Sequence, residues 1–365
     1  MPAGYFIAMR VALALASLGA TTSLAACGTS APAARSEHVV TSMSGVTVQV
    51  PNQVGRIAEQ FPAHTTTDIM LGVGDKVVAI PQNVKTLPFL SKVFPRVKSI
   101  PELFHNGGAV NMEDLLQLKP DVVSAVDGGA TLKPFQEVGL PAVDMNFNTF
   151  QQLTQSMVLA GQVYGGDAVG RAQSFTEYVN AKVQLVRSRL ASLPSARRPS
   201  VVHIASYPPL VVDGGTSLID EWIKLAGGTD AASPLSGASG THVTVTMEQL
   251  LTWNPDVLIV ETPGGDQGIA ANSGQSVVTA LANTPGWQNL RAVQNHRVYL
   301  NPQGLYPWDR FGPEEALQVQ WAAKTLHPEL FTDLDIRAEA RAFYQRFFAY
   351  DPSDSELDQI FQVGR

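Results

Sequence analysis

The 365-residue sequence contains a single cysteine, Cys27, so a framework of disulfides within the chain is excluded. It has no run of lysine or arginine and a formal net charge of −7. This charge argues against nucleic acid as the main partner, because phosphate binding needs basic patches. The apolar run over residues 11–20 is too short for a transmembrane helix, which needs about 20 residues.

Sequence patterns of common catalytic and metal sites are also missing. There is no pair of histidines at helical spacing and no cluster of acidic and histidine side chains, so a bare metal ion with a full set of protein ligands is not predicted. There is no Gly-x-Ser-x-Gly motif and no metalloprotease motif, so we do not expect an enzyme.

The N-terminus has the order of an export signal. Arg10 precedes the apolar run, and Leu-Ala-Ala precedes Cys27, which resembles the bacterial lipoprotein box. We expect a signal peptide over residues 1–26, with Met9 as an alternative start, and lipidation of Cys27. A flexible tether rich in Ser, Ala, Thr and Gly then covers residues 27–45. The protein would be anchored in the cell envelope, outside the cytoplasmic membrane, without spanning the membrane. An ordinary secretory signal with a stray cysteine is the alternative.

A twelve-residue phrase occurs twice, 135 residues apart. Residues 112–123 read Met-Glu-Asp-Leu-Leu-Gln-Leu-Lys-Pro-Asp-Val-Val, and residues 247–258 read Met-Glu-Gln-Leu-Leu-Thr-Trp-Asn-Pro-Asp-Val-Leu. Each copy predicts a short amphipathic helix, a Pro-Asp turn and an apolar strand, because proline keeps the preceding residue out of the helical region. Two copies at this distance indicate two similar α/β lobes rather than a solenoid, with a ligand cleft between the lobes.

Alternating strand and helix patterns support this organisation. Residues 46–166 are predicted as an N-terminal lobe, with a first strand at 54–61 and a first helix at 67–73. Residues 167–193 contain no proline and keep helical apolar spacing, which predicts one long helix between the lobes. Residues 194–365 then form a C-terminal lobe. The predicted fold class is α/β, with two Rossmann-like lobes built on parallel sheets.

The repeated phrase, the long helix and the lipoprotein box together resemble the substrate-binding lipoproteins of metal-chelate ABC importers, over roughly residues 46–350. The segments Trp308–Glu314 and 327–331 (His-Pro-Glu-Leu-Phe) add to the resemblance. It implies two lobes joined by one rigid helix, and one surface glutamate on each lobe that docks on arginines of the permease. Glu113 and Glu248 match these two positions. The alternative is that each glutamate only stabilises the first turn of its helix.

Ligands of parallel α/β lobes contact the loops beyond the carboxyl ends of the strands. The side chains expected there are aromatic, imidazole or cationic, and they suit a flat or anionic chelate. They are His64, His105, Tyr207, His242, Tyr306, Trp308 and Arg310. His105 follows a strand in a glycine-flanked loop and is the candidate ligand to a chelated metal. As alternatives, Trp308 packs under its loop, Arg310 pairs with Glu314, and His64 is a turn residue.

The leading hypothesis is a monomeric binding protein without an intrinsic cofactor. It captures a metal chelate and delivers it to an ABC permease and its ATPase. An iron–siderophore is favoured; nickel–histidine, cobalamin and haem are the alternatives on the same fold. An enzyme or a sensor tethered to the envelope is the alternative of another class.

Overall fold

The computed structural model describes residues 36–105, 109–126, 131–215, 217–235, 242–261 and 277–363. Residues 36–365 form one compact unit. The predicted signal peptide and Cys27 lie outside the described residues. The tether prediction is wrong from Glu37 onward, because β1 (Glu37–Thr41) and β2 (Thr47–Pro51) form an antiparallel hairpin with Val40 and Val50 buried. Within the described ranges, no helix has the length and hydropathy needed to cross a membrane.

The N-terminal sheet has five parallel strands in the order β5-β4-β3-β6-β7. The strands are β3 (Ile57–Glu59), β4 (Val77–Pro81), β5 (Glu102–Phe104), β6 (Val122–Ala125) and β7 (Ala142–Asp144). The helices that follow them in turn are α1 (Pro62–Met70), α2 (Pro88–Val93), α3 (Met112–Gln117), α4 (Lys133–Glu137) and α5 (Phe150–Tyr164). The first strand is shorter than predicted, and the first helix begins earlier, at Pro62. Proline suits the first helical turn, where its missing N–H would have no partner.

The C-terminal sheet runs in the order β11-β9-β8-β12-β13, and β10 pairs with β8. Its strands are β8 (Ser200–Ser206), β9 (Val211–Asp213), β10 (Thr229–Asp230), β11 (His242–Thr244), β12 (Val257–Val260) and β13 (Val298–Leu300). β10, β12 and β13 run parallel to β8, as predicted, whereas β9 runs antiparallel to β8, and β11 antiparallel to β9. The four residues 207–210 between β8 and β9 are too few for a parallel crossover, so this pair forms a hairpin.

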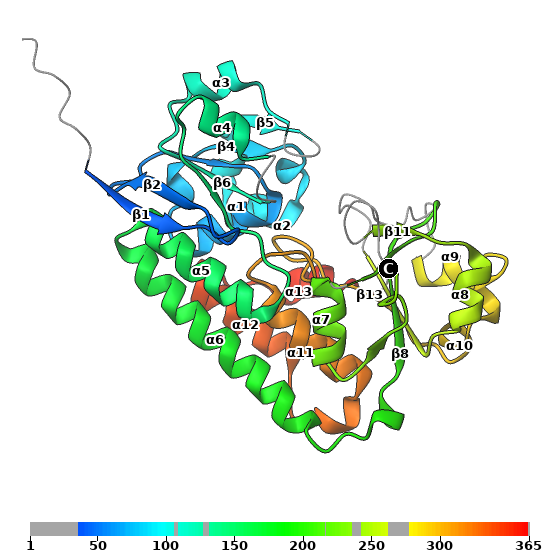
Figure 1. Cartoon of the computed structure of the whole chain (residues 1–365). Coiled ribbons are helices and arrows are strands. Elements are labelled where there is room, and N and C mark those ends of the chain that lie inside the picture. The colour runs from blue at the N-terminus through cyan, green and yellow to red at the C-terminus, as the bar shows by residue number, and fades with distance from the viewer. Residues whose placement is uncertain are drawn as a thin grey trace, which may run out of the picture. The chain divides into compact units, whose positions relative to one another are not determined.

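The helices of the C-terminal half lie between and after these strands. They are α7 (Leu218–Leu225), α8 (Met247–Trp253), α9 (Val277–Ala282), α10 (Arg291–Gln294), α11 (Glu315–Leu326), α12 (Ile336–Phe348) and α13 (Asp354–Ile360). The long helix between the two sheets is α6 (Asp167–Leu190), three residues shorter than predicted. At 1.5 Å per residue, its 24 residues span about 36 Å. Figure 1 shows α5 and α6 side by side.

Both copies of the repeated phrase fold as predicted, into α3 with β6 and α8 with β12. After each helix, the residue directly before the proline has a left-handed backbone: Lys119 (φ 46°) after α3 and Asn254 (φ 42°) after α8. The aspartate after each proline accepts hydrogen bonds from the neighbouring strand segment. Asp121 Oδ2 accepts from the N–H of Arg56 at 2.9 Å, and Asp256 Oδ2 accepts from the N–H of Ser200 at 2.9 Å. β6 and β12 therefore occupy equivalent places beside β3 and β8.

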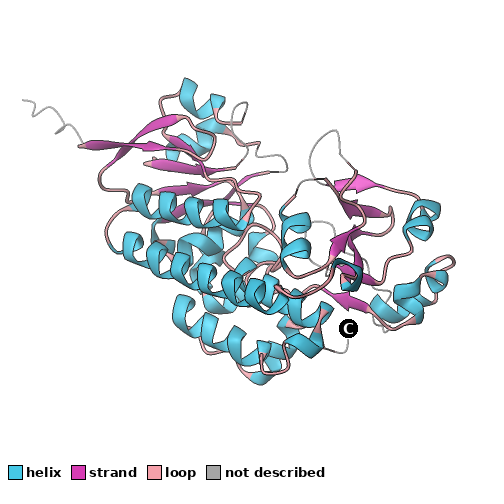
Figure 2. Ribbon diagram, turned by 60° about the horizontal axis from the view of Figure 1, so that its bottom comes forward, coloured by secondary structure: helices cyan, strands magenta, loops and turns pink. Residues whose placement is uncertain are grey.

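Alternate residues of each sheet face two different hydrophobic clusters, as the pleat requires. Ile57 and Val122 of the N-terminal sheet share one cluster with Val201 and Ile259 of the C-terminal sheet and with α5, α6, α11 and α12. We call the faces that carry these residues the inner faces. Separate clusters cover the outer faces. Figure 2 shows the strands gathered in two places with helices between them. One continuous core therefore reaches from sheet to sheet.

Candidate ligand-binding site

A cluster of buried charged side chains lies on the inner face of the C-terminal sheet. His203 is in β8 and Asp213 ends β9. Glu261 follows β12, while Asp309 and Arg310 lie in the segment between β13 and α11. All five side chains are buried, although they come from four segments that are far apart in the sequence. We call them the charged cluster.

Arg310 and His203 hold the three carboxylates together. The Arg310 guanidinium donates to Asp213 through Nη1–Oδ1 at 3.1 Å and Nη2–Oδ2 at 2.9 Å, and to Glu261 Oε2 through Nε at 3.2 Å and Nη2. His203 lies between Asp213 (Nδ1–Oδ2 2.7 Å) and Asp309 (Nε2–Oδ2 2.8 Å). The two parallel hydrogen bonds from Arg310 to Asp213 use the planar, forked shape of the guanidinium group.

The charges in the cluster set each other's protonation states. Burial opposes a charge on His203, but the hydrogen bonds and charges of Asp213 and Asp309 raise its pKa to about 9. Burial also opposes a charge on Asp213, yet Arg310 and His203 hold the pKa of this carboxyl well below its ordinary value. At neutral pH, Asp213 is therefore ionised between two cations. Burial is what raises the pKa of Glu261, against the opposing effect of Arg310.

His242 connects this cluster to the surface. It is the first residue of β11, and its side chain is 38% exposed. Its Nε2 lies 3.2 Å from Oδ1 of the ionised Asp213. Because this carboxylate only accepts hydrogen bonds, the ring proton belongs on Nε2, and Nδ1 carries the lone pair in the neutral ring. A carboxylate behind an imidazole is the arrangement that orients histidines toward metals in proteins.

The N-terminal sheet contains a second buried polar group, formed by Glu59, His64, Asp68 and Ser124. His64 Nδ1 lies 3.3 Å from Ser124 Oγ and 3.7 Å from Glu59 Oε1. Burial lowers the pKa of His64 to about 4, so the ring is neutral. Burial also raises the pKa of Asp68 to about 7, and burial together with the charge of Asp68 raises that of Glu59. Burial beside Ser124 and the helix α1 thus disfavours a charge on both acids, and His64 has almost no exposed surface.

His105 and Tyr207 are more accessible than His64. His105 is exposed in the loop after β5, where its Nδ1 lies 3.2 Å from Gln82 Oε1. This contact leaves Nε2 as the nitrogen with the lone pair, since an amide oxygen only accepts. Tyr207 is half-buried after β8, and its ring meets Trp287 edge to face with centroids 5.2 Å apart.

Tyr306 and Trp308 lie in the interior of the segment after β13. Trp308 has no exposed surface, and its Nε1 donates to the Tyr344 hydroxyl at 3.1 Å. The same hydroxyl donates to Glu314 Oε1 at 2.6 Å, and the Tyr306 N–H donates to Glu314 Oε2 at 2.9 Å. The Trp308 ring therefore packs under its loop, and Glu314 pairs with these groups while Arg310 pairs with Asp213 and Glu261. Burial raises the pKa of Glu314 to about 7.

Glu113 and Glu248 occupy the same place in the two copies of the repeat. Each is exposed and is the second residue of its helix, α3 or α8. The caps are similar too: Asn111 accepts from the N–H of Glu113 at 3.0 Å, and Thr246 accepts from the N–H of Gln249 at 3.2 Å. Backbone and Thr246 contacts lower the pKa of Glu248. Both carboxylates are free to reach solvent from equivalent positions.

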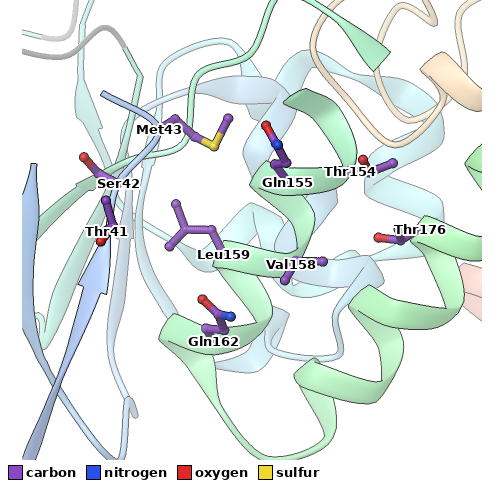
Figure 3. Close-up of a pocket in the computed structure, with 9 residues that line it drawn as sticks. All are labelled: Thr41, Ser42, Met43, Thr154, Gln155, Val158, Leu159, Gln162 and Thr176. Carbon is purple, nitrogen blue, oxygen red and sulfur yellow. The ribbon is translucent and has the colours of Figure 1, made fainter. Parts of the chain in front are cut away.

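A surface hollow of about 420 Å³ lies elsewhere, between β1, α5 and α6. Figure 3 shows its walls, which contain hydroxyl, amide and apolar side chains without a charge. They are Thr41, Ser42, Met43, Thr154, Gln155, Val158, Leu159, Gln162 and Thr176. None of the predicted site residues contributes to this hollow, so it is separate from the groups at the strand ends.

In the described ranges, no group of three or more His, Cys, Asp or Glu side chains is arranged so that it could hold a metal ion. The exposed imidazoles of His105 and His242 belong to different sheets. The arrangement suits a metal that brings most of its ligands with it.

The sequence analysis did not identify His203, Asp213, Glu261, Glu59 or Asp68 as site residues. A usable signal exists for Glu261, because it directly ends an apolar run, Val-Leu-Ile-Val-Glu at 257–261. An acid directly after a buried strand is placed at the sheet edge where ligands bind. His203 gives no such signal, since it alternates with buried apolar residues inside β8.

Comparisons with known proteins agree with this architecture. The family model described as "Periplasmic binding protein" matches residues 57–305. The molybdate-binding protein MolA of Haemophilus influenzae is 25% identical over 353 residues, covering 88% of this chain and 94% of that protein. A periplasmic solute-binding protein of Veillonella parvula shares 26% identity, with a TM-score of 0.76 over 90% of this chain and 98% of the other.

The fold also matches CeuE of Helicobacter pylori in its nickel–histidine complex. The TM-score is 0.70 at 18% identity, and the match covers 89% of this chain and 99% of that chain. These matches confirm the predicted two-lobed α/β fold and the resemblance to solute-binding proteins of ABC importers.

Proposed function

Because the chain belongs to the periplasmic binding protein family, we propose that it captures a metal chelate outside the cytoplasm and delivers it to an ABC permease and its ATPase. Family membership supports a binding protein rather than an enzyme. An iron–siderophore remains the favoured ligand, with nickel–histidine, cobalamin and haem as alternatives. The proposal includes lipidation of Cys27, which would keep the protein at the membrane surface.

The contact between His242 and Asp213 is the observation that carries the choice of a metal chelate. Asp213 is fully buried and fixed by Arg310 and His203, so it holds the exposed imidazole in one orientation and one tautomer. An imidazole with a fixed lone pair suits iron, nickel, copper or cobalt. His105, oriented by Gln82, offers a second imidazole from the other sheet. A chelate with open coordination positions could use either nitrogen.

The charged cluster also bears on the ligand's charge. Arg310 was expected to attract an anionic chelate, but its guanidinium already serves Asp213 and Glu261 in the interior. A small oxyanion such as molybdate, the ligand named for the Haemophilus relative, needs donors that are not already paired. We therefore place a chelated metal before a bare oxyanion.

Glu113 and Glu248 are proposed as the docking acids. Their equivalent exposed positions on α3 and α8 suit two-pronged pairing with one arginine each on the permease. Their separation would then depend on the relative position of the two lobes, which allows the permease to distinguish loaded from empty protein.

The test is quenching of intrinsic tryptophan fluorescence in a chain that starts at Ser36, the first residue of the compact unit. The panel contains a ferric hydroxamate, a ferric catecholate, nickel with histidine, cobalamin, haem and molybdate. We expect saturable quenching by one metal chelate, and at least tenfold weaker binding by His242→Ala. His296→Asn is the matched control, because His296 is exposed before β13 with a left-handed backbone (φ 55°) that asparagine tolerates.

Two results would contradict the proposal. Binding of molybdate alone would replace the chelate with an oxyanion. If the parent and the double variant at His105 and His242 bound a chelate with equal affinity, the two imidazoles would not be part of the binding site.

A further inference from the structure

Phe311 has a backbone conformation that bulky residues rarely adopt. It lies between Arg310 and Gly312, in the segment that joins β13 to α11, with φ at +54°. A non-glycine residue in the left-handed region is uncommon, and such residues are kept where the surroundings determine them. Here the Phe311 N–H donates to Glu315 Oε1 at 3.2 Å, and the preceding Arg310 is fixed by Asp213 and Glu261.

This conformation places the Phe311 ring against the other sheet. Its centroid lies 5.9 Å from that of Phe61 and 5.7 Å from that of Phe147, both in edge-to-face geometry. Phe61 follows β3 and Phe147 follows β7, so both come from carboxyl ends of the N-terminal sheet. Phe147 is buried, whereas Phe61 and Phe311 are half-buried.

The neighbouring backbone is close to the same place. A methyl group built on Gly312 would lie 3.5 Å from Thr66 Oγ1 and 3.9 Å from Cβ of Ala63, both in the helix α1 that follows β3. The segment after β13 therefore rests on the start of α1 as well as on the two rings. It carries Arg310 at one end of this contact, and Arg310 holds the carboxylate that orients His242.

We infer that Phe311 is a positioning residue: its ring, seated between Phe61 and Phe147, fixes the carboxyl end of the C-terminal sheet relative to that of the N-terminal sheet. The left-handed backbone is retained because an ordinary conformation would point the ring elsewhere. Other contacts tie the N-terminal sheet to the C-terminal helices, such as Phe89 with Tyr344 at 5.1 Å. Those contacts act through α2 and α12 and do not reach the charged cluster. Phe311 contacts the carboxyl ends of β3 and β7, and it directly follows Arg310 of the charged cluster.

The first test needs no ligand. Spin labels are placed at Asp114→Cys on α3 and Gln249→Cys on α8, which are exposed residues on the two lobes. The chain from Ser36 has no other cysteine. Pulsed EPR then gives the distribution of distances between the labels. We expect Phe311→Ala to at least double the width of this distribution, and Phe311→Tyr, which keeps the ring, to leave it unchanged.

Phe94→Ala is the matched control. Phe94 is also half-buried, but it packs beside Gly74, at the amino end of β4 and so at the opposite edge of the N-terminal sheet. Loss of this ring should lower stability without widening the distribution. A Phe311→Ala protein with the parent's distribution would overturn the inference. If Phe311→Ala does not fold, Phe61→Leu tests the same contact from the other side, with the same widening expected and the same overturning result.

A second test rests on the proposed function. For whichever chelate binds, Phe311→Ala should raise the dissociation rate about tenfold, while the association rate stays within a factor of two. An unchanged dissociation rate would contradict a role in holding the binding geometry. Failure of every chelate to bind would refute the proposed function, and the EPR result would still decide the role of Phe311.

Discussion

Gly304 lies where no side chain fits. A methyl group built on this residue would lie 2.0 Å from Glu314 Oε1 and 2.0 Å from the Tyr344 hydroxyl oxygen. The Tyr344 hydroxyl donates a hydrogen bond to Glu314 Oε1 at 2.6 Å, and the same carboxylate accepts a hydrogen bond from the N–H of Leu305 at 2.8 Å. All of them are buried, so Gly304→Ala must displace a fully packed polar network that supports the segment leading to Arg310.

The expected loss of stability has two parts. Overpacking of a well-packed interior costs about 1–3 kcal/mol. A hydrogen bond to a charged or polarised acceptor, here the one between Tyr344 and Glu314, contributes about 1.5–3 kcal/mol when it is lost. We therefore expect Gly304→Ala to lower the free energy of unfolding by roughly 3–5 kcal/mol. For a compact unit of this length, this corresponds to a fall in Tm of roughly 4–7 °C.

Gly170→Ala is the control for the general effect of replacing glycine. Gly170 is exposed inside α6, and nothing lies within 4 Å of a methyl group built there. Alanine should raise stability by roughly 0.5–1 kcal/mol at such a helical site. Urea unfolding followed by circular dichroism measures both variants. A Gly304→Ala protein within 1 kcal/mol of the parent would refute the packing described for Glu314 and Tyr344.

Three further predictions concern charged groups. Asp68→Asn should stabilise the fold at pH 8 by on the order of 3 kcal/mol and have little effect at pH 4. Burial raises the pKa of Asp68 in the folded state from 3.8 to about 7, so the parent loses stability as the pH rises from 3.8 to about 7. The free energy of unfolding of the parent and the variant, measured at pH 4 and pH 8, tests this. Arg310→Met should cost about 3–5 kcal/mol, because Asp213 would remain buried without its partner, and Arg310→Lys should restore only part of this. Charge reversal at both Glu113 and Glu248 should abolish uptake in cells but leave the fluorescence titration unchanged; uptake that survived would remove the docking assignment.

The features that the sequence predicts well are local. In both copies of the repeat, the helix, the proline turn and the following strand depend on neighbouring residues, and both formed as predicted. The same holds for α6, whose helical spacing is uninterrupted from Asp167 onward. Errors occur where short-range patterns are weak. Strand β1 lies in the stretch 27–45, which was predicted as a tether from its small and polar residues, although Val40 is buried in the hairpin with β2.

The candidate site depends on contacts between distant segments, and these left little trace in the sequence. Arg310 meets Asp213 across 97 positions of the chain, and Glu261 across 49. The side chain of Arg310 was read as a surface cation for an anionic ligand because its partners were not recognised. Trp308 was similarly expected to face the ligand, yet Tyr344, 36 positions away, binds it in the interior. Burial decided what each of these side chains contacts.

The two lobes neutralise their buried acids by different means, and this difference has a consequence for ligand binding. In the C-terminal lobe, Arg310 and His203 supply fixed positive charge, so Asp213 stays ionised through the physiological range. In the N-terminal lobe, burial instead raises the pKa of Glu59, and that of Asp68 to about 7. A change in pH around 7 therefore alters charge in the interior of the N-terminal lobe while the carboxylate behind His242 stays constant. Asp68→Asn would remove the contribution of the N-terminal lobe to any dependence of affinity on pH in this range. The contribution of Glu314, whose pKa burial also raises to about 7, would remain.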